Sequence, residues 1–324
     1  MFVSIDPAHS RAAAPLPAYL AIKPQLSLVM VVYMTGPALM ESVRHVLAEP
    51  RVEEFIIVDN GSSLADAAWL RELARREPRV RLLQGLGNIG FARAANLGAA
   101  AAKGDELVFL NPDAFLTPGA ISALSDAARD RPSPCVVGAR VFNTDGTEQR
   151  GARRGEITPV TTLLSLSKLS ATLPPLRRFE IHRESEAPPS HPVDTPTISG
   201  ACFYMTASDF HLLGGFDEGY FLHVEDIDLC WRARRQGGCV LFQPNARIVH
   251  VGSTSRENPL VVEWHKGKGL VRYFLKRADS KRRKALALLL APLILGVAVA
   301  RPLLRLARRG GAERPAQRLA PIAS

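Results

Sequence analysis

The chain has 324 residues, of which 47% are hydrophobic and 22% are charged, enough for one large α/β domain or two small ones. Its formal net charge of +10 is uneven: residues 266–324 hold 15 Lys and Arg against two acids, a local net of +13, and residues 1–265 have a net of −3. A main domain without basic excess argues against a nucleic-acid-binding core and for a separate basic surface element.

The N-terminal residues and the cysteines bear on the compartment. Residues 1–25 form a Pro/Ala-rich lead-in with charged residues before any apolar run, which is not the pattern of a signal peptide. None of the four cysteines has a C-x-x-C spacing, and each lies in an apolar or helical context. This pattern predicts a cytosolic chain with four reduced thiols, at Cys135, Cys202, Cys230 and Cys239.

Apolar runs and helical patterns alternate through the first third of the chain. Strands are expected over residues 26–33, 54–59, 79–84 and 105–111, and helices over 38–48, 64–76 and 91–102. Such alternation predicts βαβ units in a parallel sheet, which binds ligands at the carboxyl ends of its strands. Because Tyr33, Asp59 and Asp113 follow three of these strands, we expect them to converge on one edge of the sheet.

The pattern is less regular after residue 113. A helix with Pro118 at its first position is expected after Thr117. Residues 151–197 are rich in Ser, Pro and Arg and weakly patterned, which predicts a variable or mobile insertion. Further strands are expected over residues 136–142, 197–205, 239–242 and 248–251, and helices over 207–213 and 260–277.

The stretch from Phe221 to Arg232 crowds three carboxylates into four residues, where an apolar run gives way to a helical pattern. Carboxylates this close repel one another, so one of Glu225, Asp226 and Asp228 needs a raised pKa or a nearby cation. A helix N-terminus also favours carboxylates through its dipole. Two interpretations follow: an acid-rich helix start, or a base that removes a proton from a substrate hydroxyl.

Residues 85–90 match the pattern G-x-G-x-x-G, follow a predicted strand and open a predicted helix. Alone, this pattern suggests dinucleotide binding. That fingerprint normally follows the first strand of its unit, however, and two β-α units precede it here. The glycines are better explained by a tight loop beside a ligand.

Asp113 and His250 each allow two interpretations. Asp113 could cap a local turn, or it could offer a hard oxygen to a divalent cation that also binds diphosphate oxygens. His250 lies near the end of a predicted strand, where a structural role and a ligand role are both open.

Residues 285–300 form a 16-residue uncharged run with basic residues on both sides. At about 1.5 Å per residue the run spans about 24 Å, short of the roughly 30 Å hydrocarbon core, and Pro292 and Gly296 interrupt it. Basic flanks on both sides would violate the positive-inside preference of a spanning helix. We therefore expect a monotopic or re-entrant contact with an anionic membrane surface; a true span and a helix packed on protein are the alternatives.

Taken together, the motifs resemble family-2 glycosyltransferases with the GT-A fold, and most closely the rhamnosyltransferase-like branch that acts on bacterial cell-surface polysaccharides. The resemblance covers roughly residues 26–252. It implies an α/β domain over residues 26–255, with a mostly parallel, Rossmann-like sheet flanked by helices, and a basic, apolar helical segment over 256–324. The motifs that carry it are residues 31–33, 58–62, 88–92 with Asn96, 109–113, 199–201, 215–217, 225–228 and 231–232.

The resemblance also assigns the site residues. Asp226 would be the catalytic base, with Glu225 holding the acceptor and Gly200 letting it approach. Asp113 would be the metal-binding acid of the D-x-D motif, and His250 would complete a Mg²⁺ or Mn²⁺ site. The first acid of that motif is Asn111 here, so the metal site loses one charge. The donor nucleotide would be bound by Tyr33, Asp59, Asn60, Asn88, Gly90, Asn96 and Asn111, with Arg232 a further candidate to stabilise the leaving diphosphate.

The expected function is the inverting transfer of a sugar, with rhamnose from a dTDP donor suggested, to a lipid-linked or polysaccharide acceptor at the cytoplasmic face of the inner membrane. One alternative is a nucleotidylyltransferase, which would need a Gly-rich, basic loop after the first strand; residues 34–37 lack it. The other is a non-catalytic nucleotide-sugar-binding scaffold, against which the pair of Glu225 and Asp226 argues.

Overall fold

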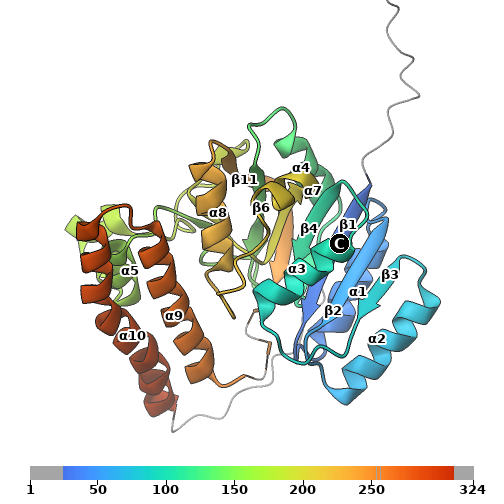
Figure 1. The fold of residues 1–324 in the computed structure, drawn as a ribbon, viewed down its shortest axis with the longest axis horizontal. Helices are drawn as coiled ribbons and strands as arrows, with labels where there is room; N and C mark the ends of the chain where they lie inside the picture. The colour runs from blue at the N-terminus through green and yellow to red at the C-terminus, as the bar shows by residue number, and fades with distance from the viewer. Residues whose placement is uncertain (1–24, 253, 256, 310–324) are drawn as a thin grey trace, which may run out of the picture.

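The chain folds around one large sheet, with helices packed against it and a pair of long helices at one side (Figure 1). This computed structural model describes residues 25–252, 254–255 and 257–309. The predicted lead-in therefore lies outside the described residues, except for Gln25.

The first four strands of the main sheet run parallel in the order β3-β2-β1-β4. Every residue of β1 is buried, as expected for a central strand covered on both faces. Each element ends within one residue of its predicted bounds. The strands are β1 (Leu26–Val32), β2 (Glu54–Asp59), β3 (Val80–Leu83) and β4 (Glu106–Leu110), and the helices between them are α1 (Ala38–Ala48), α2 (Leu64–Arg76) and α3 (Phe91–Ala101).

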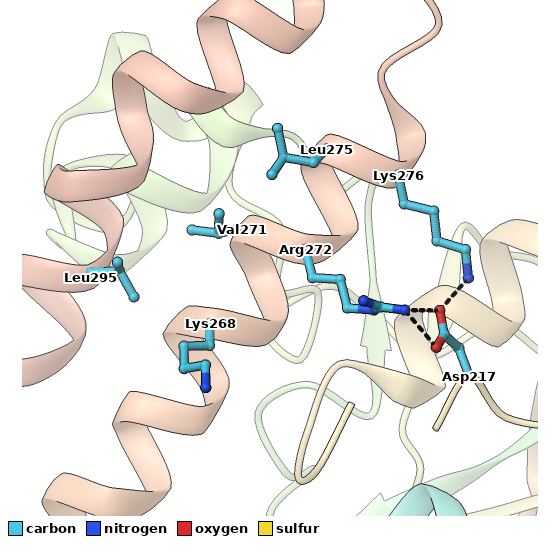
Figure 2. Close-up of a pocket in the computed structure, with 7 residues that line it drawn as sticks. All are labelled: Asp217, Lys268, Val271, Arg272, Leu275, Lys276 and Leu295. Carbon is cyan, nitrogen blue, oxygen red and sulfur yellow. Dashed lines mark hydrogen bonds and ion pairs between the residues drawn. The ribbon is translucent and has the colours of Figure 1, made fainter. Parts of the chain in front are cut away.

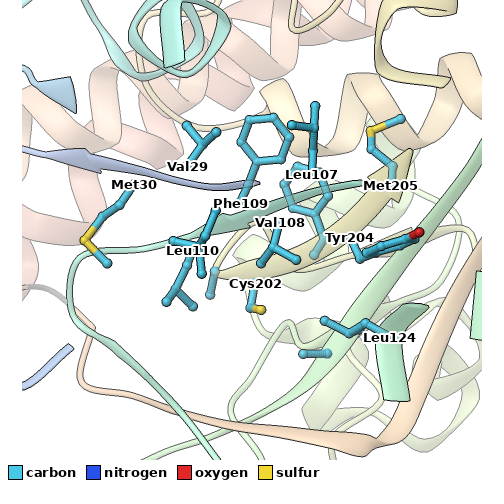
Figure 3. Close-up of a cluster of buried hydrophobic side chains, with 14 of the residues drawn as sticks. Val29, Met30, Leu107, Val108, Phe109, Leu110, Leu124, Cys202, Tyr204 and Met205 are labelled. Carbon is cyan, nitrogen blue, oxygen red and sulfur yellow. The ribbon is translucent and has the colours of Figure 1, made fainter. Parts of the chain in front are cut away.

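Beyond β4 the sheet continues through β10, β6, β11 and β5. The strand β10 is antiparallel to both of its neighbours, and β11 runs parallel to β6. The packed centre between β4 and β10 is built from Phe109, Leu107, Tyr204 and Met205, with Leu110 close by (Figure 3). The elements are β5 (Ala114–Leu116), α4 (Ala120–Ala128), β6 (Cys135–Phe142), β10 (Cys202–Thr206), α7 (Ala207–Leu212) and β11 (Cys239–His250).

Four local expectations differ from the structure. The short strand β5 was not predicted. The helix α4 begins at Ala120, because Gly119 adopts a left-handed turn (φ 77°) between Pro118 and the helix. The two strands expected at 239–242 and 248–251 are one strand with a register shift between Gln243 and Arg247, where Pro244 cannot donate to the ladder. The strand expected at 197–205 is divided, because residues 199–201 leave the ladder.

The segment 151–197 contains regular structure that the sequence pattern did not predict. Its two-residue strand β7 (Arg153–Arg154) pairs with β9 (Thr197–Ile198), and β8 (Val193–Asp194) adds to β11. A capping box between Thr158 and Thr161 begins the helix α5 (Pro159–Leu166). The helix α6 (Leu169–Thr172) and the 3₁₀ turn η2 (Pro174–Phe179) follow. The helix α5 of this segment lies beside α10, away from the main sheet (Figure 1).

Three helices close the fold: α8 (Glu225–Arg235), α9 (Pro259–Arg277) and α10 (Lys281–Arg309). A second apolar cluster joins α8 to α9 through residues such as Ile227 and Tyr273, and reaches α10 through Ile294. Contrary to the expected interruption, α10 is one helix of 29 residues that contains Pro292. By length and composition alone, its first 20 residues, Lys281–Ala300, could cross a membrane, with a mean hydropathy of 1.9.

Candidate active site

The carboxyl end of β2 is closed by Asp59. Its Oδ1 accepts from the backbone N–H groups of Gly61 and Ser62, at 3.2 and 2.8 Å, and its Oδ2 accepts from the Gln84 amide at 2.9 Å. Both carboxylate oxygens therefore hold the loop that follows the strand. The predicted contact of Asp59 with a nucleoside would use the lone pairs that these donors leave.

The glycine-rich loop touches both the end of β2 and the acidic stretch. Asn60 donates to Asn88 Oδ1 at 3.2 Å. Gly90 has φ 85°, and a Cβ there would lie 2.7 Å from the Phe221 carbonyl oxygen. That carbonyl also accepts from the Phe91 N–H at 2.8 Å. Because Gly90 has no side chain, the loop at the edge expected to bind the nucleotide donor lies directly against the segment that precedes α8.

Tyr33 lies beside this edge, as predicted from its place at the end of β1. A Cβ on Gly61 would lie 3.2 Å from the Tyr33 ring. The Tyr33 hydroxyl donates to Glu257, and this bond, together with burial, raises the pKa of Tyr33. Glu257, which lies between β11 and α9, therefore contacts the edge of the sheet that is expected to bind the nucleotide.

Asp113 and His250 converge from β5 and β11, although they are 137 residues apart. His250 Nε2 lies 3.1 Å from Asp113 Oδ1 and 3.3 Å from the Asn111 amide nitrogen. Thr254 donates to Asp113 Oδ2 at 2.9 Å. Burial disfavours ionisation of Asp113, but its contacts with His250 and Thr254 outweigh this effect, so the pKa of Asp113 lies below its usual range.

Gln149 orients the His250 ring. Its Nε2 donates to Asn143 and to the His250 carbonyl, both at 3.1 Å, so its Oε1 faces His250 Nδ1 at 2.7 Å. An amide oxygen can only accept, so Nδ1 carries a proton. Nε2 is then the ring nitrogen left to bind a ligand, in the manner of metal-binding histidines.

These residues fit a divalent cation that is shared with a bound diphosphate. Two electron-pair donors as close as His250 Nε2 and Asp113 Oδ1 repel unless a proton or a cation lies between them. No group of three or more His, Cys, Asp or Glu side chains with metal-site geometry occurs among residues 25–252, 254–255 and 257–309. A cation here would therefore take its remaining ligands from diphosphate oxygens and water.

Asn111 and Gly200 connect this cluster to the acidic stretch. The Asn111 N–H donates to the Ala201 carbonyl at 2.9 Å, and the Gly200 N–H donates to Asp226 Oδ2 at 3.1 Å. A Cβ on Gly200 would lie 3.2 Å from the Asp226 Cβ. The break between β9 and β10 thus has a specific cause: the backbone at residue 200 turns to bind the first turn of α8.

Asp226 is the anchored member of the acid pair. Besides Gly200, its Oδ2 accepts from Arg154 Nη2 at 3.2 Å, and its Oδ1 accepts from the Ile227 N–H at 2.8 Å. Arg154 belongs to β7, inside the segment expected to be variable. These three donors fix the position and orientation of the carboxylate.

Glu225 is the opposite case. Its side chain is buried, and its Oε2 has no hydrogen-bond partner among the described residues. Burial, followed by repulsion from Asp226, raises the pKa of Glu225 to about 8. Glu225 therefore keeps its proton at neutral pH.

The two residues before the pair have strained backbones. His223 and Val224 have φ values of 66° and 77°, a region that branched side chains rarely adopt. Such strain costs of order 1–3 kcal/mol per residue and persists where the surroundings enforce it. Here a Cβ on Gly269 of α9 would lie 2.9 Å from the Val224 side chain, so α9 packs directly against the strained turn.

Asn96 and Arg232 were predicted to bind the nucleotide-sugar donor. Their side chains do not lie with the other residues predicted for that role. Asn96 binds the backbone N–H and carbonyl of Phe216, at 2.8 and 2.9 Å. The Arg232 guanidinium donates hydrogen bonds to Asp228 and to the carbonyls of Leu213 and Gly215. Both side chains fix the loop before α8, so the geometry favours a structural role over the predicted donor contact.

The comparison with known families bears on what this arrangement does. The profile described as Glycosyl transferase family 2 matches residues 27–208, more than half of the chain. The chain belongs to glycosyltransferase family 2. It is thus an enzyme that transfers a sugar from a nucleotide-sugar donor, which decides against the nucleotidylyltransferase and the scaffold.

Curated relatives agree with this assignment. The chain is 31% identical, over 251 residues, to the N-acetylglucosaminyl-diphospho-decaprenol L-rhamnosyltransferase of Mycobacterium tuberculosis, and the match covers 72% of this chain and 78% of the relative. It is 26% identical over 190 residues to the low-salt glycan biosynthesis hexosyltransferase Agl10 of Haloferax volcanii, covering 57% of this chain and 54% of the relative. The predicted rhamnosyltransferase-like resemblance is confirmed at the level of the family and of this relative.

Two solved structures share the fold. GalNAc-T7 with UDP, GalNAc and Mn²⁺ superposes with a TM-score of 0.57 and 18% identity, over 80% of this chain and about half (48%) of that one. The mannosyltransferase PcManGT from Pyrobaculum calidifontis, in complex with GDP-Man and Mn²⁺, gives a TM-score of 0.55 and 16% identity, over 90% and 77%. These similarities confirm the predicted α/β GT-A fold.

Sequence reasoning missed several residues that hold this site. Arg154 lies in a segment without a clear pattern, and Gln149 and Thr254 are polar residues in loops with no motif of their own. Glu257 likewise belongs to no sequence motif. Each acquires its role only through a partner far away in the sequence, such as the 72 residues that separate Arg154 from Asp226.

The raised pKa of Glu225 predicts a pH-dependent stability. The folded chain holds this proton up to about pH 8, whereas an unfolded glutamate ionises near its ordinary value of 4.5. The stabilising contribution is therefore complete below about pH 4.5 and is lost as the pH rises toward 8. Relative to wild type, Glu225→Gln should gain unfolding free energy across this window, by at most about 1.4 kcal/mol per pH unit.

Urea unfolding between about pH 5 and pH 8.5 measures this difference. Glu53→Gln, at an exposed glutamate of the same domain, is the control and should give a flat difference. A flat difference for Glu225→Gln as well would show that Glu225 is ionised in the folded protein.

Proposed function

We propose that this enzyme performs an inverting transfer in which Asp226 accepts the proton of the acceptor hydroxyl. The observation that carries the proposal is the contact of Asp226 with Gly200, next to the Ala201 contact with Asn111. Through these contacts the acid pair and the cluster of Asp113 and His250 approach one space from two sides. A single inverting displacement needs this arrangement, with the base and the leaving diphosphate on opposite sides of the anomeric carbon.

The two acids divide the work. A sugar hydroxyl has a pKa far above 7, so it needs a base in the transition state, and the carboxylate of Asp226 is in place to act as that base. Protonated Glu225 can donate its hydrogen bond to an acceptor oxygen, which matches the acceptor role expected for it. Asp113 and His250 would hold a divalent cation, which would offset the charge developing on the diphosphate.

The acceptor side of the proposal is a lipid-linked glycan at the membrane. Support comes from the Mycobacterium relative, which is named for an N-acetylglucosaminyl-diphospho-decaprenol substrate, and from α10. The helix buries Ala287, Ile294 and Ala298 against the protein but leaves Leu288 and Leu289 59% and 74% exposed. We propose rhamnose as the sugar and the cytoplasmic face of the inner membrane as the location, with α10 lying at the surface.

Asp226→Asn tests the base. Because asparagine cannot take the proton, turnover should fall by about two to four orders of magnitude while nucleotide-sugar binding is kept. Steady-state transfer and calorimetric donor binding measure the two quantities. Asp126→Asn, on the exposed face of α4, is the matched control and should behave as wild type. Near wild-type turnover of Asp226→Asn would assign the base to another group.

Asp113→Ala tests the cation. Removal of the one carboxylate at this position should weaken nucleotide-sugar binding in Mn²⁺ or Mg²⁺ and abolish most of the difference that the metal makes. Glu53→Ala removes an exposed acid of the same domain and should leave both unchanged. If wild-type activity survives excess EDTA, the cation is dispensable, and Asp113 is a sugar or ribose ligand.

The exposed leucines of α10 test the membrane contact. Replacing Leu288, Leu289 and Leu293 with Gln removes apolar surface without touching the buried side of the helix. Flotation with anionic vesicles should be lost, together with activity on membrane-embedded acceptor, while donor binding remains. Gln at Leu64 and Leu212, which are exposed leucines outside α10, is the control. Equal flotation of both variants contradicts an α10 contact.

A further inference from the structure

A cavity of about 600 Å³ lies between α9, α10 and the loop before α8, away from the residues assigned to the donor. One wall is cationic: Lys268, Arg272 and Lys276 stand four residues apart on α9 and so share one face of the helix. Figure 2 shows Arg272 and Lys276 pointing to Asp217, the one acid among the lining residues.

The other wall of the cavity is apolar. Val271 and Leu275 of α9 lie across from Leu295 of α10 (Figure 2). Within the two turns before Leu295, the α10 side chains Leu288, Leu289 and Leu293 are exposed. The apolar wall is therefore shared between α9 and the helix that we propose to touch the membrane, and an occupant of the cavity would have both a polar and an apolar part.

The charge of the cavity remains positive after its internal pairs are formed. Asp217 forms ion pairs with Arg272 at 2.9 Å and with Lys276 at 2.7 Å. Lys276 forms a second ion pair, with Asp228 of α8, at 2.8 Å. Lys268 forms no ion pair within the part of the chain that the structure describes. Arg232 also pairs with Asp228, so this cluster has four cations against two acids. The positive excess suits a ligand with more than one negative charge.

The cavity also lies close to the acid pair. Asp228, which Lys276 contacts, is three residues along α8 from Glu225, a rise of about 4.5 Å. The Arg272 guanidinium lies 5.5 Å from the centre of the Tyr220 ring, in the segment that leads to α8. A sugar attached to an anionic group in the cavity would thus lie near the first turn of α8, which carries the acid pair.

We propose that this cavity binds the diphosphate and the first isoprenoid units of the lipid that carries the acceptor sugar. The cations of α9 take the diphosphate, and the seam of Val271, Leu275 and Leu295 takes the start of the chain. The proposal rests on the proposed function for the identity of the acceptor, but the binding site itself is tested without transfer. A phospholipid headgroup is the rival occupant, and its single phosphodiester charge matches the three cations less well.

The probe is farnesyl diphosphate, a short lipid diphosphate, titrated calorimetrically into the full chain in EDTA. Lys268→Glu should weaken its binding at least tenfold, because this cation is exposed and free of ion pairs within the described residues. Lys268→Arg keeps the charge and should stay within about twofold of wild type. Lys281→Glu makes the same charge change at an exposed lysine that does not line the cavity, and should also stay within about twofold.

Further titrations separate the sources of binding. Inorganic diphosphate should bind more weakly than farnesyl diphosphate if the apolar wall contributes. Asp113→Ala should leave farnesyl diphosphate binding unchanged, because Asp113 lies with His250 in the cluster assigned to the nucleotide donor and does not line the cavity. Loss of binding in Asp113→Ala, or equal effects of Lys268→Glu and Lys281→Glu, overturns the proposal. Displacement of the probe by phosphatidylglycerol vesicles at equal lipid concentration assigns the cavity to phospholipid and also overturns it.

A kinetic comparison distinguishes this proposal from the function on which it rests. With lipid-diphosphate-linked acceptor, Lys268→Glu should raise the acceptor KM at least tenfold and leave kcat within about twofold. With an alkyl glycoside of the same sugar, which has no diphosphate, KM should not change. If wild type transfers to neither acceptor, the proposed function fails, whereas the calorimetric result still decides whether the cavity binds lipid diphosphate.

Discussion

The position of the acid pair depends on one buried carboxylate, Asp228. It is fully buried, and it accepts from Arg232 at 2.7 Å, Lys276 at 2.8 Å and the Tyr220 hydroxyl at 3.3 Å. A buried charge without partners costs several kcal/mol, so this carboxylate holds its partners in place. They come from α8, from α9 and from the segment before α8. One charge therefore fixes the first turn of α8 against the C-terminal helices, and with it the orientation of Glu225 and Asp226.

Glycine backbones complete the assembly of the site. Gly90 lets the glycine-rich loop lie against the Phe221 carbonyl, and Gly200 lets the chain approach Asp226. In both places a Cβ would lie within 3.2 Å of a neighbouring atom. A larger residue at either position would therefore push the neighbouring backbone away from the segment that carries the acid pair. The strained turn at His223 and Val224 lies between these two contacts. Strain of this kind is maintained by the packing of α9, which explains why a helix outside the sheet matters for the chemistry.

The elements in the first third of the chain were predicted nearly residue by residue, because periodicity and turn residues are local signals. The sequence also predicted that Asp113 and His250, 137 residues apart, share a site, but only through the family resemblance. What it did not predict depends on distant partners: the break at residue 200 is made by Asp226, and Arg154 acquires its role from the same carboxylate. Asn96 and Arg232 show the converse, since motif residues that resemble ligands hold the loop before α8 instead. Local pattern cannot tell a side chain that binds substrate from one that binds the backbone beside it.

The charge asymmetry of the chain also has a structural explanation. The basic excess lies after residue 265, and the structure divides it between α9 and the flanks of α10. On α9, Arg272 and Lys276 turn inward to Asp217 and Asp228, so part of the excess is structural. On α10, one face packs on α9 through Ala287, Ile294 and Ala298, so lipid cannot surround the helix in this arrangement. A helix with one face on protein and the other apolar and exposed is suited to the membrane surface, where basic flanks add roughly 1 kcal/mol per residue. The short apolar run and the long helix are therefore both compatible with the proposed surface contact, which needs an apolar face and does not need a spanning length.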